Sequence, residues 1–254
     1  MHLNTAIFLF FASAIGGGIN AVAGGGSFVA FPALLFTGVP AIPANATNTL
    51  ALWVGTTASG GAYPQKLNIS RRVMIPLVLT SILGGLAGAF LLIKTSAQTF
   101  LHVLPWLLLG ATLLFAFGKH LTGRISAGIS HDASNASVAG ASLFELLVAV
   151  YGGYFGAGMG IVFLAVLDWF SPGNLQDNNA IKNWLQCLVN VVATLIFLAK
   201  GLVLIVPGIA LMAGGLVGGY VSGQLARRLD PKVLRLGVVA YGIIITCVFA
   251  ARLF

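Results

Sequence analysis

The chain has 254 residues, of which 58% are hydrophobic and 7% are charged, and its formal net charge is +8. A soluble domain is about 25% charged, so this composition excludes an ordinary soluble fold and predicts an all-α integral membrane protein. The positive charge does not indicate nucleic-acid binding, because basic residues occur at most two in a row.

The first element is an apolar stretch over 4–36 that is too long for one membrane crossing and is interrupted by Gly24–Gly26. A glycine inside a helix costs about 1 kcal/mol relative to alanine, so we expect a helical hairpin that bends at these glycines. A spanning helix needs about 20 apolar residues, and candidates follow at 43–62, 72–93 and 99–118. Together these elements make a first membrane unit over 1–118.

The second half of the chain repeats this order after a polar linker over 119–136. Another apolar stretch, 137–170, is broken by glycines, and candidate spanning helices follow at 178–199, 203–225 and 233–252. Similar segments occur in the same order in both halves, for example NATNTLALWVGTTA from Asn45 and NAIKNWLQCLVNVVATL from Asn179. We therefore interpret 137–254 as a second membrane unit that arose by internal duplication.

Basic residues indicate how the two units lie in the membrane, because cytoplasmic loops carry an excess of Lys and Arg. Three segments are assigned to the cytoplasmic side on this basis: 63–71, 119–136 and 226–232. The segment that matches 226–232 in the first unit is 94–98, whose one basic residue is Lys94. The two units are therefore expected to form inverted-topology repeats. Each hairpin then starts and ends on one side, with two legs of about 14–17 residues, and the two hairpins enter from opposite sides.

The chain contains the stretch GGGINAVAGGGSFVAFPALLFTGVPAIPANATNTLALWVG and, later, GGYFGAGMG. With these motifs it resembles the sulfite exporter TauE/SafE family of membrane transporters. The family's glycine motif, its Pro, its G-x-P loop and its A-x-A-T-(S/N) segment correspond to Gly24–Gly26, Pro32, Gly38–Pro40 and Ala44–Asn48. Met159 departs from the pattern, because it stands where the second motif would have a third glycine. The resemblance implies a secondary transporter of the inner or plasma membrane that moves sulfite, sulfoacetate or a related organosulfonate by alternating access.

Substrate contacts are expected where the hairpins bend and on the helices that follow them. Bent hairpins expose helix N-termini, whose N–H groups and partial positive charge suit an anion. Polar residues then recur at three- and four-residue spacing, and hence on one helix face. The expected substrate-binding residues are Asn20, Gly24, Gly25, Gly26, Ser27, Asn45, Asn48, Thr49, Tyr154, Gly156, Gly158, Lys182, Asn183, Gln186 and Asn190. The alternatives are close helix packing, interhelical hydrogen bonds and, for Lys182, a place at the membrane surface. Close packing is what we expect for Gly84–Gly85 and Gly214–Gly215.

Glu145 lies within an apolar stretch, where an acid is a candidate for proton coupling; the alternative is a structural pair with a basic or amide group. The sequence has no G-x-x-x-x-G-K-[ST] loop and no cluster typical of a catalytic or metal site, so neither an enzyme nor a cofactor or metal is expected. The expected partners are a small anionic substrate and the lipid bilayer, without nucleic acid, and a homodimer is compatible with the sequence. An anion channel and a carrier of a sulfur-free organic anion are the alternative functions.

Overall fold

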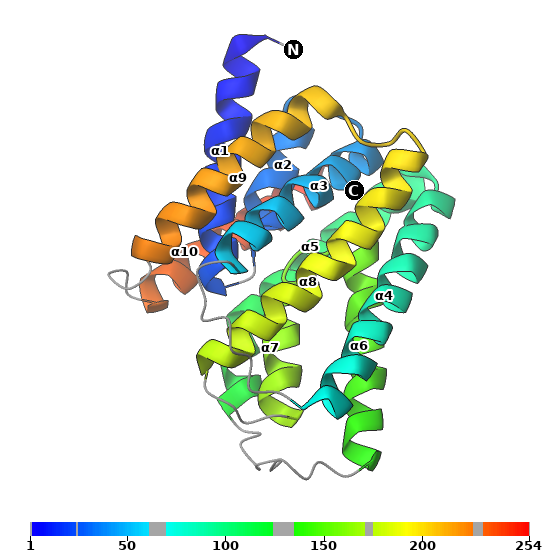
Figure 1. The fold of residues 1–254 in the computed structure, drawn as a ribbon. Coiled ribbons are helices and arrows are strands. Elements are labelled where there is room, and N and C mark those ends of the chain that lie inside the picture. The colour runs from blue at the N-terminus through cyan, green and yellow to red at the C-terminus, as the bar shows by residue number, and fades with distance from the viewer. Residues whose placement is uncertain are drawn as a thin grey trace.

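The computed structural model describes residues 2–23, 25–60, 70–123, 135–170, 175–225 and 231–253. Over these residues the ordered elements are all helices, as predicted. The helices of the first half are α1 (Leu3–Ala23), α2 (Ser27–Phe36), α3 (Ala41–Gly60), α4 (Arg71–Lys94) and α5 (Ala97–Gly123). Those of the second half are α6 (Asn135–Tyr154), α7 (Met159–Phe170), α8 (Leu175–Ala199), α9 (Ile205–Leu225) and α10 (Pro231–Leu253), as Figure 1 shows.

The outer surface of this helical assembly is suited to lipid. Within the described ranges, three helical segments are long and apolar enough to cross a membrane: Leu3–Asn20, Arg71–Lys94 and Ala180–Ala199. Large apolar side chains such as Leu79, Leu83, Leu195 and Ile209 are more than half exposed. So much outward apolar surface is unfavourable in water and matches a bilayer environment. We conclude that the chain is an integral membrane protein.

The chain breaks at both predicted bends, but the legs of each hairpin are unequal. α1 has 21 residues and α2 has 10, while α6 has 20 and α7 has 12. At 1.5 Å per residue, α1 is about 31 Å long and matches a bilayer core of about 30 Å, whereas α2 is about 15 Å long. The expectation of two similar legs is therefore wrong. The reason is that the break falls just before Ser27, well past the middle of 4–36, whereas Gly16 and Gly17 nearer the middle remain helical. These two glycines serve close packing instead: a Cβ on Gly17 would lie 2.6 Å from the carbonyl oxygen of Gly215.

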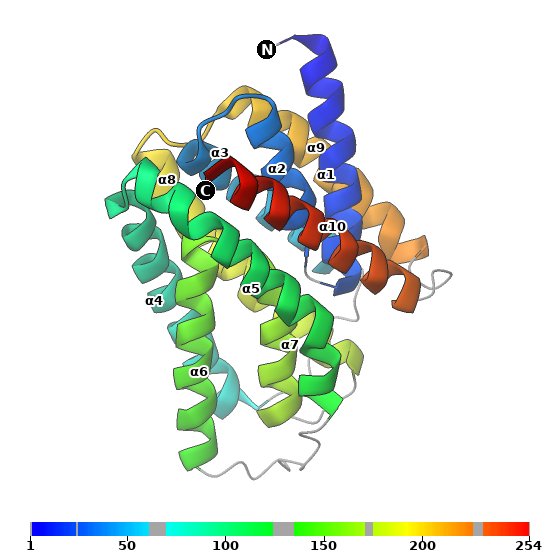
Figure 2. The same cartoon turned by 180° about the vertical axis from the view of Figure 1, so that it is seen from behind.

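Helices of the two halves pack against each other in a regular pattern (Figures 1 and 2). α1 packs chiefly against α9, and α6 packs chiefly against α4. α3 also contacts α9, as α8 contacts α4, while α3 lies against α8 and α5 lies against α10. α1 begins at the top of Figure 1 and α6 begins at the bottom, so these two helices run in opposite directions.

Glycines allow the close approach between α1 and α9 and between α4 and α6. A Cβ on Gly218 would overlap the carbonyl oxygen of Ala14, and a Cβ on Gly88 would overlap the carbonyl oxygen of Val150. Gly84, Gly85, Gly214 and Gly215 also face atoms of neighbouring helices at short distance. The close packing predicted for these two glycine pairs is confirmed. As in other membrane proteins, small residues here bring helix backbones together.

A buried aromatic cluster joins the two hairpins. Phe31 of α2 and Phe155 of the second bend meet edge to face, with ring centroids 5.4 Å apart. The ring of Phe100 on α5 lies 6.5 Å from that of Phe31 and 6.3 Å from that of Phe155. All three rings are almost completely inaccessible to solvent. Edge-to-face pairs of this kind are favourable contacts, and here they fix the two hairpins relative to each other inside the molecule.

Candidate functional site

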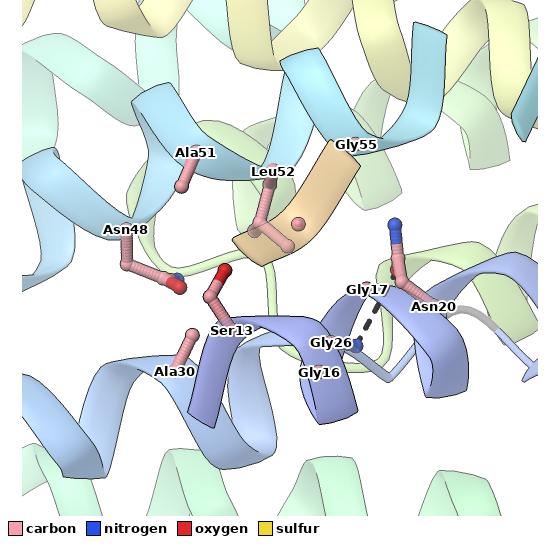
Figure 3. A pocket seen from close by; sticks show the side chains of 11 residues that line it. Ser13, Gly16, Gly17, Asn20, Gly26, Ala30, Asn48, Ala51, Leu52 and Gly55 are labelled. Atoms are coloured by element: carbon pink, nitrogen blue, oxygen red, sulfur yellow. Dashed lines mark hydrogen bonds between the residues drawn. The ribbon is translucent and has the colours of Figure 1, made fainter. Parts of the chain in front are cut away.

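The first bend joins α1 to α2 and lies against α3. The backbone N–H of Gly26 donates a hydrogen bond to Asn20 Oδ1 at 3.4 Å (Figure 3). The side-chain amide of Asn48 on α3 donates to Ser27 Oγ at 3.2 Å. Asn20, Ser27 and Asn48 are all buried. The fold therefore gathers predicted substrate residues from three helices around the N-terminus of α2.

The second bend, between α6 and α7, depends on glycine for its backbone shape. Gly156 and Gly158 have φ angles of +77° and +74°, in the left-handed region that other residues rarely adopt. The Asn45 side-chain amide donates to the backbone carbonyl of Tyr154 at 2.9 Å, at the end of α6. Asn45 and Asn48, which are neighbours on one face of α3, thus each hold one of the two bends. Part of the role predicted for them is structural.

A row of buried amides on α8 completes the polar centre. Gln186 Nε2 donates to Asn20 Oδ1 at 3.4 Å, which places this face of α8 beside the first bend. Both amide atoms of Asn183 and of Asn190 lack a hydrogen-bond partner among the described residues, as does Oε1 of Gln186. These side chains are 1% exposed, and the preceding Lys182 is 0% exposed. A buried polar group left unpaired costs about 1–3 kcal/mol, so this row is suited to gain partners from a bound molecule.

The corresponding face of α3 shares this property only in part: Oδ1 of Asn45 and Oδ1 of Asn48 also lack a partner among the described residues, but both side-chain N–H groups donate. Thr49 and Thr56 match Asn183 and Asn190 when the two similar segments are aligned from Asn45 and Asn179. The Thr49 hydroxyl donates to the carbonyl of Asn45 at 2.9 Å, and the Thr56 hydroxyl donates to that of Leu52 at 2.7 Å. Threonine can satisfy itself on its own helix in this way, whereas asparagine at the matching positions does not. In the described part of the chain, the buried side-chain amide donors left unpaired are those of Asn183 and Asn190 on α8.

A small cavity lies between α1, the first bend and α3 (Figure 3). Its polar lining comes from Ser13, Asn20 and Asn48, and the rest comes from glycines and apolar side chains. Its volume of about 10 Å³ corresponds to the room needed by one water molecule. The cavity is thus closed to any larger molecule in this conformation.

Glu145 occupies a separate polar position, between α6 and α4. Its Oε1 accepts a hydrogen bond from Ser81 Oγ at 2.7 Å. Its Oε2 has no hydrogen-bond partner in the described part of the chain, although the side chain is only 1% exposed. Glu145 does not line the cavity beside the first bend. Across the described ranges, no group of three His, Cys, Asp or Glu side chains could hold a metal ion.

One predicted glycine lies outside the described residues, and one residue that lines the cavity was not predicted. Gly25 is buried at the first bend, whereas Gly24 lies outside the described residues. Ser13 was not predicted: it is a buried cavity residue whose hydroxyl donates to the carbonyl of Leu211 at 2.6 Å. The spacing of Ser13 and Asn20, seven residues apart with glycines between them, places both on one face of α1 and could have revealed it.

Comparisons with known proteins agree with this membrane architecture. The sequence pattern of the family described as sulfite exporter TauE/SafE matches residues 9–249. A probable membrane transporter protein, ORF9, of Sinorhizobium sp is 27% identical over 228 residues, which cover 90% of this chain and 85% of that protein. A probable membrane transporter protein of Haemophilus influenzae is 26% identical over 242 residues, covering 94% and 91%. YfcA of Escherichia coli K12, also a probable membrane transporter protein, is 26% identical over 251 residues, covering 96% and 88%. No solved structure gives a significant match.

Proposed function

Because the chain belongs to the TauE/SafE sulfite exporter family of membrane transporters, we propose that it carries a small sulfur-containing anion, such as sulfite, sulfoacetate or a related organosulfonate, by alternating access. The observation that carries this proposal is the row of unpaired amides on α8. The N–H groups of Asn183 and Asn190 can donate to the oxygens of an anion. Hydrogen bonds to a charged group stabilise by about 1.5–3 kcal/mol each.

The surroundings of this row also suit a negative charge. Ser27 and Met159 begin α2 and α7, so both half-helices direct their N-termini toward the buried centre. A helix N-terminus carries a partial positive charge and free N–H groups. Lys182, which directly precedes Asn183 on α8, adds a buried side chain with a formal positive charge. We assign to Lys182 the role of offsetting the charge of the substrate.

The packing of the helices supports two inverted repeats. The contacts of α1 with α9 are matched by those of α6 with α4, and the glycine contacts at both interfaces correspond. α3 meets its own counterpart α8, and α5 meets α10. A two-fold axis in the membrane plane would produce this arrangement, and it would make α1 and α6 antiparallel, as in Figure 1. Such repeats rock against each other in alternating access, around a site near the midplane.

The orientation that we propose follows from the charged loops. Residues 63–69 and 124–134, and the basic pair at 227–228, lie outside the described residues, so their assignment to the cytoplasm rests on the positive-inside rule. The basic residues Arg71 and Arg72 begin α4 on that side. We propose the inner or plasma membrane as the location.

A binding screen and a transport assay test the proposed function together. Purified protein is heated with sulfite, sulfoacetate, thiosulfate or sulfur-free dicarboxylates, and we expect a sulfur-containing anion to give the largest rise in Tm, because binding stabilises the folded state. The Lys182→Met variant is expected to lose most of this rise. Proteoliposomes should then show saturable uptake and counterflow of the same anion. A sulfur-free anion as the best ligand would contradict the substrate, and flux without saturation or counterflow would indicate a channel.

Proton coupling is proposed for Glu145, whose second carboxylate oxygen is buried without a hydrogen-bond partner among the described residues. We expect an inward proton gradient to accelerate uptake by the wild type several-fold, and the Glu145→Gln variant to lose this dependence because glutamine cannot bind and release a proton. The Ser81→Ala variant is the control, since it removes the hydrogen bond to Glu145 but keeps the carboxyl group. A pH profile of Glu145→Gln identical to that of the wild type would return Glu145 to a structural role.

A further inference from the structure

The two bends are built alike but differ in what fills the space beside them. Beside the first bend lies the small cavity, whose lining includes Gly16 and Gly17. Gly153 takes the place of Gly17 in the second half. A Cβ on Gly17 would meet Gly215 of α9, and a Cβ on Gly153 would in the same way meet Gly85 of α4. Gly152 therefore takes the place of Gly16.

Met159 fills the corresponding space in the second half. Its side chain is fully buried, and its Sδ lies so close to Gly152 that a Cβ on that glycine would overlap it. Cγ1 of Val189 on α8 would lie 3.2 Å from the same Cβ. The other buried residues of this core cluster include Leu77, Ala149, Phe163 and Leu185. The counterpart of the polar cavity is thus occupied by a thioether within apolar surroundings.

We propose that Met159 limits the size of the anion that the central site accepts. The proposal rests on the proposed function, since it concerns the same site. On α3, the residues Asn48, Leu52 and Gly55 line the cavity beside the first bend. In the alignment from Asn45 and Asn179 they match Lys182, Gln186 and Val189 of α8, so the space that Met159 fills is the one expected to face the polar row of α8. Methionine is long, unbranched and adaptable, and it fills the space without offering a hydrogen bond. A shorter side chain would leave apolar room beside the amides for the tail of a longer organosulfonate.

Size selectivity in proteoliposomes tests this role. Uptake of hexanesulfonate and of methanesulfonate is compared for the wild type, Met159→Ala and the control Met159→Leu, which nearly preserves the volume. Apolar pockets discriminate by about tenfold or more for each methylene, so we expect Met159→Ala to raise the ratio of hexanesulfonate to methanesulfonate uptake at least tenfold. Met159→Leu should keep the wild-type ratio. If Met159→Ala is not recovered folded, Met159→Val is read in the same way, and a wild-type ratio in the folded variant would overturn the proposal.

A second measurement needs no substrate. The change in Tm caused by Gly152→Ala should be less favourable in the wild-type background than in the Met159→Ala background, because only in the former does the new Cβ have to displace Met159 Sδ. An equal change in Tm in both backgrounds would mean that Met159 does not fill this space. Failure of the wild type to take up any sulfur anion would count against the proposed function instead, and the Gly152 variants would still decide where Met159 lies.

Discussion

Replacing Asn183 and Asn190 together by threonine is expected to weaken anion binding by at least about 100-fold while the protein stays folded. Each asparagine can donate one hydrogen bond to the anion, and two such bonds to a charged group are together worth about 3–6 kcal/mol. Threonine should remain tolerated because it can donate to a carbonyl of its own helix, as Thr49 and Thr56 do. Isothermal titration calorimetry with the best anion of the screen measures the loss.

The matched control for this double variant is Thr112→Val. Thr112 is a buried residue of α5 whose hydroxyl already donates to the carbonyl of Leu108 at 2.7 Å. Thr112→Val also removes a buried polar group, but one that lies on α5 and not in the amide row of α8. We therefore expect this variant to bind the anion with wild-type affinity. Wild-type affinity in the double threonine variant would show that the amides of α8 serve the packing of the protein and do not bind the substrate.

Substituting Gly218 by alanine is expected to destabilise the protein by about 3 kcal/mol or more, and Gly88→Ala should act in the same way. In each case the added Cβ overlaps backbone atoms of the facing helix, α1 for Gly218 and α6 for Gly88. A backbone cannot move aside as a flexible side chain can, so whole helices must separate, and overpacking of this kind is costly. Thermal unfolding of the detergent-solubilised protein, followed by fluorescence-detected size exclusion, measures the effect.

The controls for these variants are Gly110→Ala and Gly237→Ala. Both glycines lie within helices, and a Cβ on either would meet none of the described atoms of neighbouring elements within 4 Å. Alanine should therefore be neutral or stabilise by up to about 1 kcal/mol through its higher helix propensity. Equal stability of the Gly218, Gly88 and control variants would contradict the close helix contacts described for α9 and α4.

Much of the fold follows from the sequence, because its strongest signals are local. Apolar length predicted the helices, and consecutive glycines predicted the break before Ser27. The leg lengths could not be predicted in this way. Whether a glycine breaks a helix depends on what faces it: Gly17 stays helical because it packs against Gly215, almost two hundred residues further along the chain.

The candidate site was predictable as a set of residues, but not by role. The three- and four-residue spacing correctly placed Asn183, Gln186 and Asn190 on one face of α8. The same spacing on α3 did not reveal that the polar residues there act differently. The Asn45 side chain donates to the carbonyl of Tyr154, which lies 109 residues away in the sequence. Such a partner is determined by tertiary packing, which a periodic pattern does not encode.

The hydrogen bonds at the two bends have a mechanical consequence. Asn45 ties a helix of the first half to the bend of the second, while Gln186 ties a helix of the second half to Asn20 beside the bend of the first. Each hairpin is therefore anchored to the opposite half of the protein. Displacing either hairpin must stretch a bond to the other half, so we expect the two sides of the membrane to be sealed alternately and leakage through a doubly open state to be suppressed.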